Sequence, residues 1–218
     1  MTIVRDPANS AGGVRPLVFV VDDDDGMRAA VLRVLGRAGI DGRGYHGGGD
    51  LLALASMDPA SCILLDVAMP GMDGLAVQAA LKARGAAAPV VFLTGSADIP
   101  VAVAAMRVGA VDFIEKPFDN ADLVARVRSA IEHHARQRRH DAGLADAQAR
   151  FRQLTARERE VYQRVAVGKT SKEVARELGV SHRTVEIHRA RVMEKMGAPT
   201  LAELVRKQLL VEAAAGTH

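Results

Sequence analysis

Five side chains of this sequence have the chemistry needed to bind and transfer a phosphoryl group, and all of them follow short apolar runs. Asp22 and Asp23 follow LVFVV, and Asp66 follows CILL. Thr94 follows VVFL, and Lys116 comes one residue beyond VDFI. Neighbouring carboxylates repel one another unless a cation neutralises them, and Mg2+ with oxygen ligands is the usual solution where phosphate is handled. A hydroxyl and an ammonium would hold the phosphoryl oxygens, so the set predicts an aspartate nucleophile.

The apolar runs predict the elements that must bring these side chains together. Runs over 17–21, 62–65, 90–93 and 111–114 are too short for helices and predict buried parallel strands, with a weaker strand near 44–46. Segments with helical spacing lie between them, and three of these segments end at a glycine. Strand and helix alternate about five times, which predicts an α/β fold with a doubly wound, five-stranded parallel sheet of the flavodoxin-like type. Ligands bind beside the carboxyl ends of the strands in such a sheet.

Each of these residues has a plainer explanation when it is taken alone. Aspartate is common in turns after strands, and the acidic run 22–25 could be a solvated loop that leads to a helix N-cap. Threonine and lysine occur anywhere. The coincidence of all five at strand ends favours the chemical interpretation.

The composition is that of a globular protein able to bury a core, with 49% apolar and 25% charged residues. A length of 218 residues favours two small domains. The single cysteine, Cys62, lies in an apolar run and is predicted to fill buried space rather than to act in redox chemistry. The sequence has neither a secretion-signal pattern nor a long apolar stretch, so we expect a cytoplasmic protein without a membrane segment.

The charge is distributed unevenly between the two halves. Residues 1–133 contain 12 Lys and Arg against 16 Asp and Glu, a net charge of −4, whereas residues 134–218 contain 17 against 10, a net charge of +7. The acidic half could therefore hold a cation. The basic half could approach phosphates.

The second half is predicted to be a smaller, all-α domain with a helix-turn-helix. In LTAREREV, Thr155 is an N-cap and Glu158 completes a capping box. The stretch SKEVARELGVSHRTVEIHRARVMEKM divides at Gly179 into a short helix and a longer basic helix, and Ser181 is placed to cap the second. A short helix, a tight turn with glycine and a basic helix form the DNA-binding arrangement.

The longer helix has one apolar stripe, formed by Val185, Val192 and Met196. The polar residues off that stripe could read DNA or could simply be solvated. A last helix over about 200–213 also has an apolar stripe, which could pack on the domain or support a dimer. The candidate polar residues are Arg183, Glu186, His188, Arg189 and Arg191.

Residues 15–133 resemble the receiver domains of two-component response regulators. The resemblance rests on the motifs VVDDDD, LLDVAMPGMDG, FLTGSAD and DFIEKPF. It implies the phosphoacceptor Asp66, the Mg2+ ligands Asp22, Asp23, Asp66 and the backbone carbonyl of Ala68, and the phosphoryl contacts Lys116 and Thr94.

The same resemblance casts Phe113 as an aromatic that turns inward when Thr94 engages the phosphoryl group. Core packing is the alternative for Phe113. The family also often has a cis bond at the position of Lys116–Pro117. Two features depart from common receivers: Asp25 and Gly26 enrich the first acidic loop, which would alter Mg2+ affinity or dephosphorylation, and the glycine-rich stretch 42–50 specifies its strand poorly.

The region 150–215 resembles the LuxR-type output domain, and TVEIHRARVMEKM together with the receiver motifs resembles the FixJ branch. Glu186 could accept a hydrogen bond from cytosine, or it could orient a neighbouring arginine. The resemblance implies DNA contacts, mostly to phosphates, from Lys172, Arg183, Thr184, His188, Arg189 and Lys195. It implies base reading by Glu186, Ile187 and Arg183.

These features together predict a regulator with a tail over 1–14, a receiver domain over 15–133, a helical linker over 134–150 and a DNA-binding domain over 151–218. A histidine kinase would phosphorylate Asp66, and the chain would not otherwise be an enzyme. Phosphorylation would remodel the surface around 99–107 and 111–114, and a homodimer would bind double-stranded DNA and meet RNA polymerase.

Three other functions remain open on the sequence. The chain could be a phosphorelay element whose second domain binds protein, although the basic helix argues against this. A small-molecule sensor is disfavoured because only 3% of the residues are aromatic and the predicted pocket is acidic. A dehalogenase-type phosphatase would need its nucleophilic D-x-D after the first strand, whereas Asp66 follows a later one.

Overall fold

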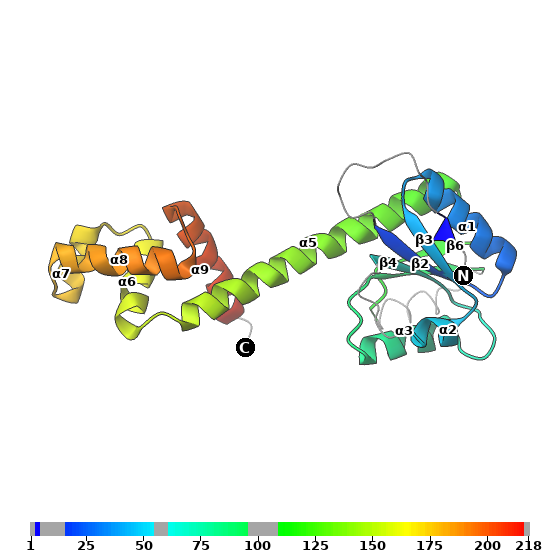
Figure 1. Ribbon diagram of the computed structural model, residues 1–218, viewed down its shortest axis with the longest axis horizontal. Helices are drawn as coiled ribbons and strands as arrows, with labels where there is room; N and C mark the ends of the chain where they lie inside the picture. Colours follow the sequence, from blue (N-terminus) through cyan, green and yellow to red (C-terminus); the bar gives the residue numbers. More distant parts are fainter. Residues whose placement is uncertain (1–2, 5–15, 55–60, 96–108, 216–218) are drawn as a thin grey trace. The chain divides into compact units, whose positions relative to one another are not determined.

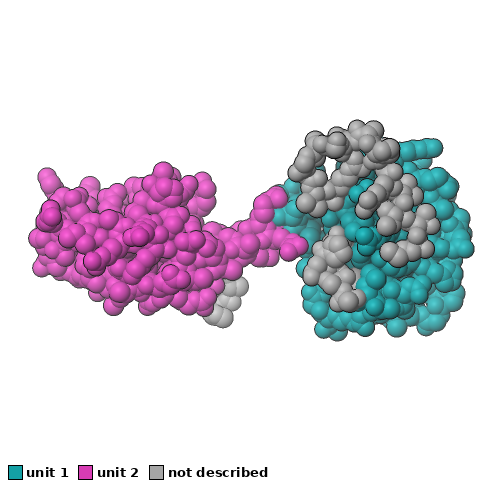
Figure 2. Space-filling model, viewed as in Figure 1, with its two compact units in different colours: residues 1–136 teal, residues 137–218 magenta. Residues whose placement is uncertain are grey.

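The protein is described here from a computed structural model, in which the chain forms two compact units, Met1–Arg136 and Gln137–His218 (Figure 2). The residues that the structure describes are 3–4, 16–54, 61–95 and 109–215.

The first unit is built on a sheet with the strand order β1-β3-β2-β4-β5-β6 within the described residues. The pairs from β3 to β6 are parallel, whereas β1 joins β3 antiparallel. The predicted five-stranded parallel sheet is therefore confirmed, and β1 is an addition at its edge. The strands are β1 Ile3–Val4, β2 Leu17–Val21, β3 Asp41–Tyr45, β4 Cys62–Asp66, β5 Val90–Thr94 and β6 Asp112–Glu115.

Helices cover both faces of this sheet (Figure 1). Buried residues of α1 and α5 pack on one face with Val18, Leu64 and Val91. Buried residues of α2 and α3 pack on the other face with Phe19 and Leu65. The doubly wound architecture follows because the strands are buried on both sides. The helices are α1 Asp25–Arg37, α2 Gly48–Leu52, α3 Gly74–Ala83 and α5 Asn120–Arg152.

The boundaries differ from the sequence prediction in three places. The weak strand begins at Asp41, earlier than predicted, because it pairs along the whole of β2 despite its glycines. The last strand is displaced by one residue, to Asp112–Glu115. Two predicted helices end at glycines with positive φ, Gly39 and Gly85. The helix expected around 101–110 and the surface over 99–107 lie mostly or wholly outside the described residues.

The second unit contains the predicted helix-turn-helix. Thr155 and Glu158 form the capping box of α6, Gly179 ends α7 in the left-handed conformation, and Ser181 caps α8 by accepting from the backbone of Thr184. Its core includes Val161, Val174, Val185, Val192 and Leu204. The helices are α6 Ala156–Ala166, α7 Ser171–Leu178, α8 His182–Met196 and α9 Leu201–Ala215.

Residues 137–152 of α5 belong to the second unit and pack within it. Ala147 is fully buried, and Asp146 pairs with Lys207 of α9 at 2.9 Å. The predicted linker is helical, but its final turns therefore also contribute to the fold of the DNA-binding unit. On α9, Leu204 is buried and Leu209 is exposed, so only part of the predicted apolar stripe packs on this unit.

Two simpler predictions concern burial and hydropathy. Cys62 is fully buried, and burial raises the pKa of its thiol to about 12, which keeps it protonated. Among the described residues, no helix combines the length and hydropathy needed to span a membrane.

Candidate functional site

The acidic pocket, defined here as Asp22, Asp23, Asp66 and Lys116, forms where strands of the first unit end. Asp22 and Asp23 follow β2, and Asp66 is the last residue of the neighbouring strand β4. One carboxylate oxygen from each of the three aspartates lies within 4.8 Å of the others. The parallel pairing of β2 with β4 brings them together, as the sequence predicts.

Lys116 directly follows β6 and completes the acidic pocket. Its ammonium donates to Asp22 Oδ2 at 2.7 Å and to Asp66 Oδ1 at 3.1 Å. The side chains of Asp22 and Asp66 are almost entirely buried, and that of Lys116 is 17% exposed. The Lys116–Pro117 bond is cis, as the family resemblance implies.

Burial and charge act in opposite directions on the pKa values of Asp66 and Lys116. Burial raises the pKa of Asp66 above its ordinary value, although Lys116 partly offsets the increase. Burial alone would lower the pKa of Lys116, but its hydrogen bonds to Asp22 and Asp66 outweigh that effect and raise it. Lys116 therefore stays an ammonium and favours the ionised form of Asp66 that a nucleophile requires.

The remaining predicted residues of this site are Thr94, Ala68 and Phe113. Thr94 ends β5, and its carbonyl accepts from the backbone of Lys116 at 2.7 Å, so the two residues are adjacent. Ala68 lies two residues beyond Asp66 and is exposed. The Phe113 side chain is 41% exposed, so the alternative of core packing is wrong for it.

The donor set of the acidic pocket fits a hard divalent cation. Three carboxylates converge, and every ligand atom they offer is oxygen. Oxygen ligands of this kind suit Mg2+, whereas softer metals favour nitrogen and sulfur. Asp24 and Asp25 do not complete this group in the structure, because Asp24 caps α1 and Asp25 pairs with Arg28.

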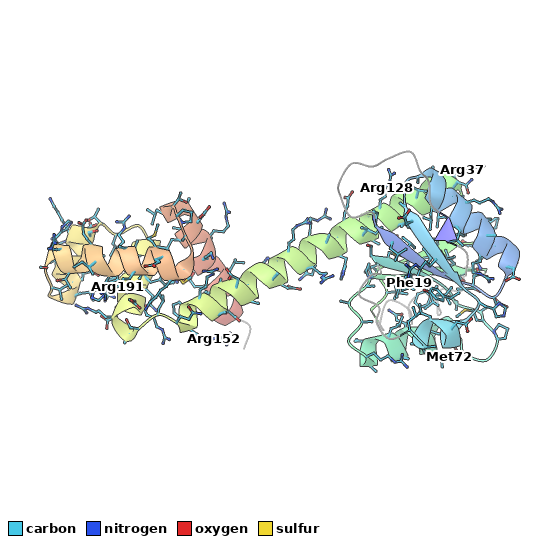
Figure 3. The ribbon with its side chains drawn as sticks, in the orientation of Figure 1. Phe19, Arg37, Met72, Arg128, Arg152 and Arg191 are labelled. Atoms are coloured by element: carbon cyan, nitrogen blue, oxygen red, sulfur yellow. The ribbon has the colours of Figure 1, made fainter. Side chains whose placement is uncertain are left out.

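The second candidate site is the recognition face of α8, defined here as Arg183, Glu186, Ile187 and Arg191, all of which are exposed. Figure 3 labels Arg191 on this helix. Val185 and Val192 anchor the opposite side in the core. The arrangement presents charged and apolar groups on a helix of the size that enters a major groove.

The other residues predicted to contact DNA differ in their exposure and in their partners within the second unit. Lys172 is exposed at the start of α7, whereas Thr184 and His188 are partly buried. Arg189 donates to Ser171 Oγ at 3.5 Å. Glu186 lies 3.7 Å from His182 Nε2 and pairs with it when the imidazole is protonated. This histidine lies beside Glu186, and both roles considered for Glu186 from the sequence stay predictions.

Lys195 has a structural partner that the sequence did not reveal. Its ammonium donates to Glu158 Oε2 at 2.7 Å, and Glu158 is buried. The bond to Lys195 is the largest cause that lowers the pKa of Glu158, from 4.5 to about 2, with the backbone of Thr155 adding to it. The pair ties α6 to α8, and the DNA contact predicted for Lys195 stays a prediction.

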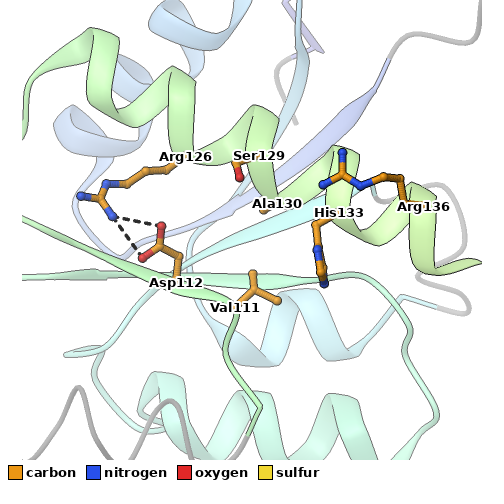
Figure 4. Close-up of a pocket in the computed structure, with 7 residues that line it drawn as sticks. All are labelled: Val111, Asp112, Arg126, Ser129, Ala130, His133 and Arg136. Carbon is orange, nitrogen blue, oxygen red and sulfur yellow. Dashed lines mark hydrogen bonds and ion pairs between the residues drawn. The ribbon is translucent and has the colours of Figure 1, made fainter.

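A cavity of about 390 Å³ lies between β6 and α5 and shares no residue with the acidic pocket (Figure 4). Arg126 lies at one end of it and donates to both carboxylate oxygens of Asp112, at 3.0 and 3.1 Å. No sequence pattern predicts this cavity. Only the spacing of Asp122 and Arg126, four residues apart on a helix, suggests a pair, which the structure forms.

Comparisons with known proteins identify a domain in each half of the chain. Residues 18–128 match the response regulator receiver domain, and residues 152–208 match the luxR family of bacterial regulatory proteins. The transcriptional regulatory protein FixJ of Azorhizobium caulinodans is 41% identical over 193 residues, which are 88% of this chain and 92% of that protein.

Solved structures show the same likeness. The response regulator StyR has a TM-score of 0.72 and 34% identity, with 91% of this chain and 99% of that chain covered. Full-length FixJ from B. japonicum has a TM-score of 0.57 and 37% identity, with 91% and 98% covered. The chain therefore belongs to the response regulators of two-component systems, with a receiver domain and a LuxR-type helix-turn-helix domain. Within that family it lies in the FixJ branch.

Proposed function

We propose that this protein accepts a phosphoryl group on Asp66 from a histidine kinase and that phosphorylation promotes its binding to double-stranded DNA as a homodimer. The convergence of Lys116 on Asp22 and Asp66 carries the proposal. A buried carboxylate held beside an ammonium and two further carboxylates is poorly explained by stability alone, because buried ion pairs are costly to desolvate.

The transfer is an in-line displacement at phosphorus. A carboxylate oxygen of Asp66 forms the new P–O bond while the P–N bond to the kinase histidine breaks, and the electron pair stays on the imidazole nitrogen. Lys116 neutralises charge on the phosphoryl oxygens. Mg2+, held by Asp22, Asp23 and Asp66 with the carbonyl of Ala68, would supply further positive charge there when bound.

The signal would leave the pocket through Thr94 and Phe113. The Thr94 hydroxyl, at the end of β5, moves to the phosphoryl oxygens. The exposed Phe113 ring turns into the space that this movement opens. The result is a shift between two populated conformations rather than a new fold.

The second unit would read DNA with its recognition face. Residues 134–218 have a net charge of +7 from 17 basic and 10 acidic residues, so long-range attraction to phosphates supports the docking of α8. Two copies would read two half-sites related by a two-fold axis.

We further propose the activity, the partners and the cellular location of the protein. It is a phosphoryl acceptor, and its only catalytic activity would be its own phosphorylation and dephosphorylation. RNA polymerase is the expected partner at promoters. The cytoplasm, where the kinase and the DNA are both accessible, is the expected location.

The experiment measures DNA affinity with and without phosphorylation. The DNA is a pool of duplexes first selected for binding to this protein. The wild type is titrated into it before and after treatment with acetyl phosphate and MgCl2, and we expect the treatment to raise its affinity for the DNA by about tenfold. Asp66→Asn should show no increase. Asp73→Asn is the matched control, because Asp73 is an exposed N-cap of α3 and asparagine also caps helices. An equal increase in the Asp66 variant would refute the proposal.

A further inference from the structure

Arg28 is the basic residue closest in sequence to the acidic pocket, and its guanidinium holds the loop that carries Asp22. Its Nη1 donates to the backbone carbonyl of Asp22 at 2.6 Å. Its Nη2 donates to Asp25 Oδ1. The Arg28 side chain is only 17% exposed, whereas that of Asp25 is 83% exposed, so the surface acid anchors a largely buried cation.

Every polar atom of Asp22 has a hydrogen-bond partner. The backbone N–H of Asp22 donates to the carbonyl of Tyr45 at 3.2 Å, and the carbonyl of Asp22 accepts from Arg28. Its Oδ1 accepts from the backbone of Asp24 at 2.9 Å, and its Oδ2 accepts from Lys116 at 2.7 Å. Of these bonds, the one from Arg28 links α1 to the peptide that follows the strand end.

The glycine-rich strand β3 makes room for this arginine. A Cβ at Gly44 would lie 3.0 Å from Cδ and 3.2 Å from Cγ of Arg28, closer than ordinary contacts allow. A Cβ at Gly42 would lie 2.6 Å from Leu32 Cδ2. The two glycines therefore let α1 approach β3, and Gly44 lets the stem of Arg28 cross the strand toward Asp22.

We propose that Arg28, anchored by Asp25 and seated over Gly44, is a positioning residue that sets the affinity of the acidic pocket for a divalent cation. It acts by fixing the Asp22 peptide, and it touches neither the cation nor the phosphoryl group. The two departures from common receivers, the acid-rich loop and the glycine-rich strand, then act together to hold Arg28 in place. The inference rests on the proposed Mg2+ site.

The direction in which Mg2+ affinity changes when Arg28 is replaced distinguishes a positioning role from a purely electrostatic one. Removing a positive charge beside an acidic pocket should by itself strengthen the binding of Mg2+, because less repulsion remains. Removing a residue that orders a ligand should weaken it, by about tenfold for partners of metal ligands. Positioning therefore predicts a result opposite in sign to the electrostatic expectation.

The experiment is a calorimetric titration of MgCl2 into the full, unphosphorylated chain. For Arg28→Gln we expect the dissociation constant to rise by about tenfold. Arg33→Gln removes the same charge from an exposed position on α1 and should change it less than about twofold. Unchanged or tighter binding by Arg28→Gln overturns the inference, and absence of binding by the wild type overturns the proposed Mg2+ site as well.

Three further variants guard against a general loss of folding. Gly44→Ala keeps every charge but displaces the stem of Arg28, so it should also weaken binding. Arg28→Lys keeps one donor and should restore part of the affinity. Asp25→Asn should weaken Mg2+ binding in the wild type but have no further effect in Arg28→Gln, because Asp25 acts through the arginine. Additive effects would contradict this, and circular dichroism without Mg2+ verifies that each variant is folded.

Discussion

The acidic pocket and the recognition face of α8 are held in opposite ways. In the pocket, side chains from separate elements converge, and Lys116 is bonded to both Asp22 and Asp66 in a nearly buried space. On the recognition face, Arg183 and Arg191 come from a single helix and are exposed, and no hydrogen bond or ion pair holds them within the described part of the chain. The pocket is complete before any ligand arrives, whereas the face is completed by its partner.

This difference determines how each site should respond to substitution. Removing one member of the pocket leaves buried charges without a partner, so the loss should be large and concentrated in a few residues. Removing one residue of the face gives up one contact among several, so losses should be small, cumulative and dependent on salt.

The largest expected effect is that of Lys116→Met on phosphorylation. Without the ammonium, charge on the phosphoryl oxygens loses a stabilising group, and the rate of labelling by acetyl phosphate should fall by roughly 100-fold or more. Lys82→Met, at an exposed position on α3, is the control and should keep the wild-type rate. A rate near that of the wild type in Lys116→Met would contradict the expectation that losses in the acidic pocket are large.

The next effect is on stability and concerns a buried pair within the DNA-binding unit. Lys195→Met leaves Glu158 buried without its ammonium, which should lower the free energy of unfolding of this unit by about 2–3 kcal/mol. Hydrogen exchange of peptides from α6 and α8 in the full chain measures the change. Lys207→Met breaks a pair with the exposed Asp146 and should cost less than about 1 kcal/mol. Equal costs would show that burial of Glu158 does not matter.

The same pair predicts a dependence on pH. The folded state lowers the pKa of Glu158 from 4.5 to about 2, so the stability it contributes is present above pH 4.5 and is lost as the pH falls toward 2. The difference in stability between the wild type and Lys195→Met should therefore be full at pH 7 and shrink between pH 4.5 and 2. Exchange measured across this range tests it, and a constant difference would exclude the assignment to Glu158.

The smallest expected effect is that of Arg183→Ala on DNA binding. Loss of one phosphate contact should weaken binding by about three- to tenfold and reduce the salt slope by about 1. Arg138→Ala removes an exposed charge from α5 in the same unit and should have the smaller effect. Titrations at several salt concentrations compare the two. Equal effects would mean that overall charge, rather than the recognition face, determines affinity.

The sequence predicts the pocket well because its geometry follows from strand order. Asp66 and Thr94 end adjacent parallel strands, so their proximity follows once the strands are recognised. The caps at Thr155 and Ser181 are equally local, since capping depends on residues three positions apart.

The features that the sequence does not predict depend on contacts between distant segments. Glu158 and Lys195 are 37 residues apart, and nothing in either helix marks them as partners. Arg28 reaches the Asp22 carbonyl across Gly44, where a Cβ would crowd its stem, and this contact depends on the packing of α1 on β3. The edge strand β1 is two residues long and has no periodicity to detect.

The central claim is that Asp66 is the residue phosphorylated, and chemical mapping tests it most directly. The chain is treated with acetyl phosphate and Mg2+, and borohydride then reduces any acyl phosphate, which converts the labelled aspartate to homoserine. Peptide mass spectrometry locates the converted residue. We expect homoserine at Asp66 alone, with roughly 100-fold less in a Lys116→Met sample treated for the same, short time. Conversion at Asp22, Asp23 or Asp73 instead of Asp66 would contradict it.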